Sequence, residues 1–221
     1  MALNQEMCDI YRLNNLHKNE FNLKFVVIGD FGVGKTSIIN RYVDGEFSQK
    51  YCITIGADFS LKTIEWDDDT RIFLQLWDIA GHEKFSSLTG VFYRHSVGAA
   101  IVFDLTRPET FNSVPQWLND LRRKTQLPDG KNIPVVILAN KGDMTVDTMP
   151  QEITDFCENN NILAWYITSA KSNIQIDEAM IRLIMESLNP IEIEYTKVDN
   201  NIIKLNETKK TSKPFWKCFN T

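Results

Sequence analysis

The chain has 221 residues, of which 43% are hydrophobic and 24% are charged. These proportions are those of an ordinary globular protein, and no run of about eighteen apolar residues indicates a membrane span. The formal charge is −5, but the four lysines among residues 209–221 make that end +4 and leave −9 for residues 1–208. An acidic body argues against a nucleic-acid groove, whereas a short basic end suits an anionic membrane surface.

The cysteines indicate the cellular compartment, and the chain length indicates the number of domains. Four cysteines occur without CxxC spacing, and the N-terminus lacks a charged-then-apolar signal pattern. A reducing cytosol is therefore favoured over secretion. The length suits one domain, which we place at residues 23–188, between an N-terminal extension (1–22) and a flexible tail (189–221).

Short apolar runs alternate with helical patterns along this central region. An Asp-rich turn at 67–69 joins two strands into a hairpin, and the later strands are continuous apolar runs of the kind that is buried on both faces. We expect a doubly wound α/β domain with a mostly parallel six-stranded sheet and one antiparallel edge strand. In chain order the predicted elements are strand 25–28, helix 36–43, strands 58–65, 70–77 and 99–103, helix 111–124, strand 135–139, helix 151–159, strand 164–167 and helix 174–188.

A phosphate-binding loop follows the first strand. Residues 29–36 match GxxxxGK[ST] between a strand and a helix, a pattern expected by chance in roughly one per cent of chains of this length. Glycines let backbone N–H groups curl around a phosphate, while Lys35 would reach the β and γ oxygens and Thr36 would bind Mg²⁺. The predicted contacts of this loop are Phe31, Gly32, Val33, Gly34, Lys35, Thr36 and Ser37.

A carboxylate for the metal is expected at the end of a neighbouring strand. Asp78 ends the apolar run 74–77 and precedes Gly81. An aspartate after a strand is more often a turn or cap residue. Downstream of a phosphate-binding loop, however, Asp78 becomes the candidate metal ligand.

Two further loops supply candidates for recognition of a base. The run 135–139 leads into Asn140-Lys141-Gly142-Asp143, and residues 168–171, Thr-Ser-Ala-Lys, close the next strand. A carboxylate can accept hydrogen bonds from the N1–H and the exocyclic amine of guanine, whereas adenine presents the wrong pattern. Asp143 is therefore expected to select guanine.

These segments, in this order over residues 23–188, resemble those of Ras-like GTPases, with GDFGVGKTS, WDIAGHE, NKGD and SAK as the shared elements. The resemblance implies the small-GTPase form of the P-loop NTPase fold, with GTP or GDP and Mg²⁺ as ligands. It also implies roles for single residues: Thr54 would meet Mg²⁺ and the γ-phosphate beside Gly81, Asn140 and Lys141 would shape the base pocket, and Ser169, Ala170 and Lys171 would face the guanine.

Within that superfamily, residues 55–59 (Ile55, Gly56, Ala57, Asp58 and Phe59) resemble the effector signature of Rab proteins. Phe59, Trp77 and Phe92 match the aromatic triad that Rab effectors contact, although hydrophobic core is an alternative role for such rings. WDIAG together with LPDGKNIPVVILANK resembles the Rab subgroup of lysosome-related organelles. The resemblance implies a membrane-traffic switch that works with effectors, an exchange factor, a GTPase-activating protein and an escort or GDP-dissociation-inhibitor chaperone.

Hydrolysis is where the sequence departs from the family. His82 stands where most members have the glutamine that orients the attacking water, and Phe31 adds a bulky ring to the phosphate loop. A histidine could polarise the water, or it could leave the enzyme slow and dependent on a partner. We expect slow intrinsic turnover, with a GTP-locked effector scaffold as the alternative. A small-molecule P-loop kinase fits less well, because NKGD would then have no role.

The C-terminal end resembles a lipidation site. Cys218 lies fourth from the end, after the lysines and Phe215-Trp216, although Asn220 is not aliphatic and Thr221 is an unusual last residue for a CaaX box. We favour prenylation of Cys218 over a free thiol, with the basic residues as a second membrane signal. The protein is then expected on the cytoplasmic face of an organelle or vesicle, in exchange with the cytosol.

Overall fold

The computed structural model describes residues 19–49, 52–83, 88–144 and 150–202, with the side chains up to residue 189. Its six strands form one sheet in the order β2-β3-β1-β4-β5-β6, in which only the edge strand β2 runs antiparallel to its neighbour. The predicted fold class is thereby confirmed. The strands are β1 (Asn19–Ile28), β2 (Ala57–Asp67), β3 (Thr70–Ile79), β4 (Gly98–Asp104), β5 (Val135–Asn140) and β6 (Ala164–Ile167).

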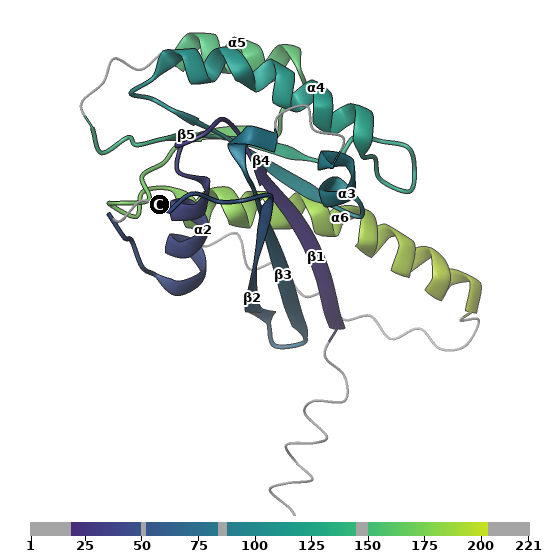
Figure 1. Ribbon diagram of the computed structural model, residues 1–221. Helices are drawn as coiled ribbons and strands as arrows, with labels where there is room; N and C mark the ends of the chain where they lie inside the picture. Colours follow the sequence, from purple (N-terminus) through teal and green to yellow (C-terminus); the bar gives the residue numbers. More distant parts are fainter. Residues whose placement is uncertain (1–18, 50–51, 84–87, 145–149, 203–221) are drawn as a thin grey trace, which may run out of the picture. The chain divides into compact units, whose positions relative to one another are not determined.

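Helices cover both faces of this sheet, and α4 and α5 lie together on one of them (Figure 1). On the other face, a Cβ at Gly98 would lie 2.7 Å from the Phe25 ring and 3.1 Å from Leu183 Cγ, so the glycine lets α6 approach the strands. Within the described residues, none of the helices is both long and apolar enough to cross a membrane. The helices are α2 (Lys35–Asp44), α3 (Thr89–Tyr93), α4 (Val114–Lys124), α5 (Pro150–Asn159) and α6 (Ile176–Ile202), with 3₁₀ turns η1 (Gly81–Glu83) and η2 (Pro108–Ser113).

The ends of the domain differ from the prediction. β1 begins at Asn19, because it pairs with β3 from Asn19 opposite Thr70 onwards, so residues 19–22 belong to the sheet and not to an extension. Helix α6 is predicted to end at residue 188, but in the structure it continues to Ile202 and includes Pro190. Contacts divide the chain into two compact units between Ser187 and Leu188. Residues 1–18 and 203–221 lie outside the described residues.

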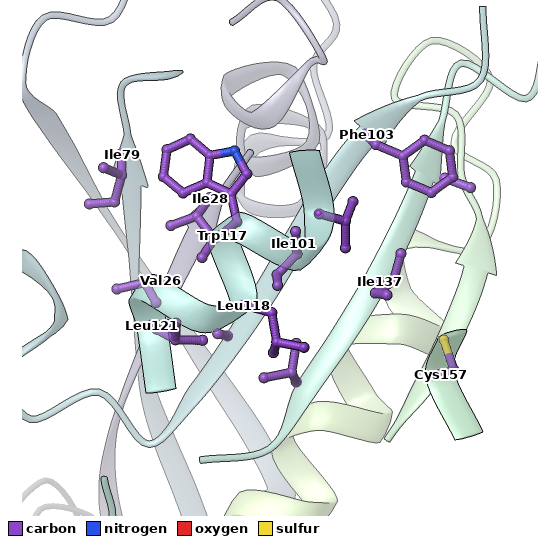
Figure 2. Packing of buried hydrophobic residues seen from close by; sticks show 14 of the residues in the cluster. Val26, Ile28, Ile79, Ile101, Phe103, Trp117, Leu118, Leu121, Ile137 and Cys157 are labelled. Atoms are coloured by element: carbon purple, nitrogen blue, oxygen red, sulfur yellow. The ribbon is translucent and has the colours of Figure 1, made fainter. Parts of the chain in front are cut away.

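The core between the sheet and α4 follows directly from the helical period. Val114, Trp117, Leu118 and Leu121 recur at helical spacing, and all four are buried. Figure 2 shows three of them beside strand residues such as Ile28. Truncating one such side chain to alanine costs about 2–5 kcal/mol, so this layer makes the sheet a rigid base for the loops at its edge.

Candidate functional site

A cavity of about 550 Å³ lies at the edge of the sheet where the parallel strands end. It is lined by the loops after β1, β5 and β6, the first turn of α2 and the segment before β2. The carboxyl ends of parallel strands are where open α/β sheets bind ligands. Of the predicted ligand-binding residues, the cavity wall contains Phe31, Gly32, Gly34, Lys35, Thr36, Ser37, Thr54, Gly81, Asn140, Lys141, Asp143, Ala170 and Lys171.

Four predicted residues lie beside this wall. Val33 and Ser169 are fully buried behind it, and Asp78 is nearly so. His82 is exposed in η1. The structure therefore brings the phosphate, metal and base candidates to one place, with Val33 and Ser169 positioned to support the loops that face the cavity.

The phosphate loop and the base loop are in direct contact, because Gly34 leaves room for the side-chain amide of Asn140. Gly34 has a φ of 100°, and a Cβ there would overlap Nδ2 of Asn140. That Nδ2 donates a hydrogen bond to the Val33 carbonyl at 2.8 Å. A side chain at Gly34 would therefore strain the backbone and separate the two loops.

Lys35 is a buried cation at the start of α2. Its Nζ donates to the carbonyls of Gly29 at 2.8 Å and Asp30 at 2.9 Å. Burial lowers the pKa of Lys35 to about 8, and nearby Asp78 and Asp30 offset only part of that effect. An anionic ligand would stabilise this ammonium, so the site suits a phosphate.

Oxygen atoms from three segments converge beside Lys35. Thr36 Oγ1 lies 3.0 Å from Thr54 Oγ1, and both hydroxyls donate to Oδ2 of Asp78. Within the described part of the chain, Asp78 Oδ1 is buried and has no hydrogen-bond partner. Burial raises the pKa of Asp78, although the hydrogen bond from Thr36 and the charge of Lys35 oppose the shift.

This donor set fits Mg²⁺. Two hydroxyls and a carboxylate are the hard oxygen ligands that the ion prefers, and in phosphate sites water and substrate complete its shell. The unpartnered Oδ1 of Asp78 is a buried charge that a cation or its water would satisfy. Thr36, Thr54 and Asp78 are therefore the residues that would hold the metal.

The base loops are joined by direct side-chain contacts. Ser169 Oγ donates to Asp143 Oδ1 at 2.7 Å, and Lys171 Nζ lies 3.7 Å from Asp143 Oδ2. Asn140 Oδ1 accepts from Ala170 N at 3.4 Å. Arg41, in the last turn of α2, donates to the carbonyl of Ala170 at 2.8 Å. The geometry thus fixes Asp143 at the cavity wall while leaving its side chain 14% exposed.

The two residues that depart from the family pattern touch each other. The rings of Phe31 and His82 have their centroids 4.5 Å apart, and Phe31 is 38% exposed. Gly81 allows this approach, because a Cβ there would overlap the backbone of Phe31. The imidazole is therefore packed on the phosphate loop.

The residues predicted to contact effectors lie along β2 and beside it. Ile55 is 89% exposed and Phe59 50% exposed, while Trp77 and Phe92 are half-buried against the core. Phe59 meets Trp77 edge-on at 5.8 Å. Gly56, Ala57 and Asp58 form the turn into β2 and its start, with Asp58 Oδ1 accepting from the backbone of Phe59. Phe59 is therefore open to solvent, whereas Trp77 and Phe92 also pack against the core, and effector contact by these rings stays a prediction.

Sequence reasoning missed several residues at this site. Asp104 could have been found, because it ends a buried apolar strand in the same way as Asp78. Arg41 and Arg107 carry no motif signal, since their contacts depend on how distant loops fold together. The cavity wall also contains Asn40, Phe47, Ser48, Gln49, Cys52 and Met144.

Comparison with known proteins decides the family. The model of the Ras family matches residues 24–189. The chain belongs to the Ras family. Three relatives are the mouse Ras-related protein Rab-32 (47% identical, 90% of this chain and 91% of the relative), Rab-32B of Dictyostelium discoideum (45%, 84% and 72%) and rat Rab-7L1 (39%, 88% and 96%).

Membership explains the architecture of the site. The resemblance to Rab proteins, including the subgroup to which Rab-32 and Rab-7L1 belong, is confirmed. Ras-family GTPases bind GTP or GDP with Mg²⁺ and hydrolyse GTP, and the Rab branch acts as a GTP/GDP switch of membrane traffic. The predicted lipidation site, Cys218, lies outside the described residues.

Proposed function

We propose that this Rab-family GTPase recruits effectors to an organelle or vesicle membrane while GTP is bound and hydrolyses GTP slowly on its own. The contact between Phe31 and His82 carries the proposal. A nucleotide-locked scaffold that binds effectors and scarcely hydrolyses GTP is the second candidate, and the same contact favours it.

The chain's own residues supply binding and orientation. The phosphate loop would surround the β-phosphate with backbone N–H groups, and Lys35 would neutralise the phosphate oxygens. Asp143 would accept hydrogen bonds from the N1–H and the amine of guanine, with Lys141 and Ala170 at the walls of the pocket. Mg²⁺, when held by Thr36, Thr54 and Asp78, supplies charge stabilisation to the transferring phosphoryl group.

Hydrolysis needs a water in line with the γ-phosphorus and the oxygen that bridges to the β-phosphate. The water forms a bond to phosphorus, the bridging bond breaks, and GDP and inorganic phosphate result. A side chain that orients the water must be free to turn toward it. Packing of His82 on the Phe31 ring opposes that movement, which supports a slow rate.

Single-turnover hydrolysis on GTP-loaded protein tests this proposal. Phe31→Ser frees His82, and His82→Gln restores the residue that most family members carry. We expect either change to raise the rate constant about tenfold or more, which is part of the roughly 10²–10⁴-fold that a positioned general base contributes. A wild-type rate equal to that of His82→Gln would contradict the proposal. A wild-type rate indistinguishable from zero, even with an activating protein, would support the scaffold.

The proposed partners follow from the switch. An exchange factor, a GTPase-activating protein and effectors would read the segments near Thr54 and Gly81, with Phe59, Trp77 and Phe92 in the effector contact. A prenyl chain on Cys218 and the neighbouring lysines would hold the protein on the cytoplasmic face of the membrane, and an escort or GDP-dissociation-inhibitor chaperone would return it to the cytosol. Intact mass of protein from its native cells measures the modification, and an unmodified Cys218 would contradict it.

A further inference from the structure

Asp104, at the end of β4, is a buried carboxylate beside the nucleotide cavity. Its side chain is 0% exposed. Oδ1 accepts from the backbone N–H of Thr106 at 2.9 Å and from its hydroxyl at 2.7 Å. Oδ2 lies 2.9 Å from Nε of Arg107 and 2.6 Å from Nζ of Lys141. Both carboxylate oxygens are thus paired with donors.

The two cations on this carboxylate belong to contacts with two different loops of the cavity wall. Arg107 uses its second nitrogen, Nη2, to donate to the carbonyl of Phe31 at 2.9 Å, so it holds the phosphate loop. Lys141 lies in the base loop and has a φ of 66°, a left-handed conformation that is unusual outside glycine. Backbone strain of this kind persists only where neighbours hold it, and the ion pair with Asp104 is such a contact.

The neighbouring charges favour the ionised form of Asp104. Burial by itself would raise its pKa, but the hydrogen bonds from Lys141, Thr106 and Arg107 outweigh burial and lower the pKa. The ion pairs restrain Arg107 and Lys141, because moving either cation away would leave the buried Asp104 carboxylate with only one of its two cations. None of these contacts uses a group that a nucleotide would need, apart from the ammonium of Lys141.

We propose that Asp104 and Arg107 are positioning residues that couple the phosphate loop to the base loop, so that tight binding of a guanine diphosphate depends on two side chains outside the nucleotide motifs. The proposal rests on the nucleotide site proposed above. Arg107 contacts the phosphate loop directly and reaches the base loop only through Asp104, whereas Asp104 itself contacts Lys141 of the base loop. Loss of Arg107 therefore weakens binding of GDP and spares GMP, which has no β-phosphate, while loss of Asp104 weakens both.

Equilibrium binding of GDP, GMP and ADP to the full chain, with Mg²⁺ present, tests this coupling. The variants are Arg107→Ala, Asp104→Asn and the pair combined. We expect Arg107→Ala to weaken GDP binding between about threefold and thirtyfold and to change GMP binding less than twofold, as for neighbouring interactions in one network. The combined loss should be smaller than the product of the two single losses, because both variants break one network.

Arg71 supplies the matched control. Its Nε lies 2.9 Å from Glu65 Oε1, the same donor atom and distance as in the Arg107 pair, but on the β2–β3 hairpin. Arg71→Ala should leave the ratio of GDP to GMP affinity unchanged. A purely structural role for Arg107 would lower thermal stability without moving this ratio.

Failure of the coupling and failure of the proposed function give different binding results. Equal factors for GDP and GMP in Arg107→Ala, or no change in either, would overturn the coupling. If Asp104→Asn does not fold, Arg107→Ala alone decides by the same ratio. Wild-type protein that binds ADP as tightly as GDP would instead contradict the proposed function, whatever the variants do.

Discussion

Replacing Trp117 by phenylalanine probes the link between the core and the phosphate loop. The indole Nε1 of this buried residue, whose side chain Figure 2 shows near Ile28, donates to Oδ1 of Asp30 at 2.8 Å. A hydrogen bond to a charged group contributes about 1.5–3 kcal/mol, and the smaller ring leaves a gap worth roughly 1 kcal/mol. Trp117→Phe should therefore lower the free energy of unfolding by about 2.5–4 kcal/mol.

Urea unfolding of the GDP-loaded protein, followed by far-ultraviolet circular dichroism, measures this loss. In a domain of this size it corresponds to a fall in Tm of about 5–12 °C. Trp165→Phe is the control, because the Trp165 indole is half-buried and donates to a neutral hydroxyl, that of Thr154, at 3.2 Å. An equal or larger loss in Trp165→Phe would refute the charged hydrogen bond as the cause.

Three further predictions concern the metal, the buried cation and the core. Because protons compete for a carboxylate whose pKa burial raises, Mg²⁺ affinity measured by titration should fall as the pH is lowered toward that pKa, and Asp78→Asn should abolish this pH dependence. In nucleotide-free protein, the unfolded chain holds a proton on Lys35 up to its ordinary pKa of 10.5 while the folded chain loses it near 8, so stability should rise between these values. The free energy of unfolding should rise by about 3 kcal/mol at most over this pH range, and Lys35→Met should remove the rise. Equal pH dependence of stability in wild type and variant would contradict the lowered pKa of Lys35. Leu121→Ala should cost about 2–5 kcal/mol in the same unfolding assay, against less than 1 kcal/mol for the exposed Leu61→Ala.

Local rules were enough to predict the sheet and most of the cavity wall. Continuous apolar runs in the sequence mark where the strands end. Because parallel strands have their carboxyl ends at one edge of the sheet, Lys35, Asn140 and Asp143, which follow such ends, meet there. The antiparallel edge strand followed from the short turn at 67–69. Glycine at position 34 was expected for phosphate binding, and the structure adds a second reason, the close approach of Asn140.

Contacts between distant segments could not be predicted in this way. Arg107 lies 76 residues from Phe31, and no pattern within either segment indicates that a guanidinium of one holds a carbonyl of the other. The early start of β1 has the same origin, because residues 19–22 are polar except for Phe21 and become strand through pairing with β3. The packing of Phe31 on His82 depends on the approach of η1 to the phosphate loop, which a backbone glycine permits.

The central place of β1 also sets the order of events during synthesis. This strand leaves the ribosome first, but its partners are residues 70–78 of β3 and 98–101 of β4. At about 5–20 residues per second, the second partner appears roughly 4–15 seconds later. For that interval the apolar run Phe25–Ile28 lacks its β4 neighbour and can pair only with β3, once residues 70–78 have emerged. Newborn chains should therefore be clients of a ribosome-associated chaperone, and slowing translation between residues 28 and 98 should lengthen that dependence.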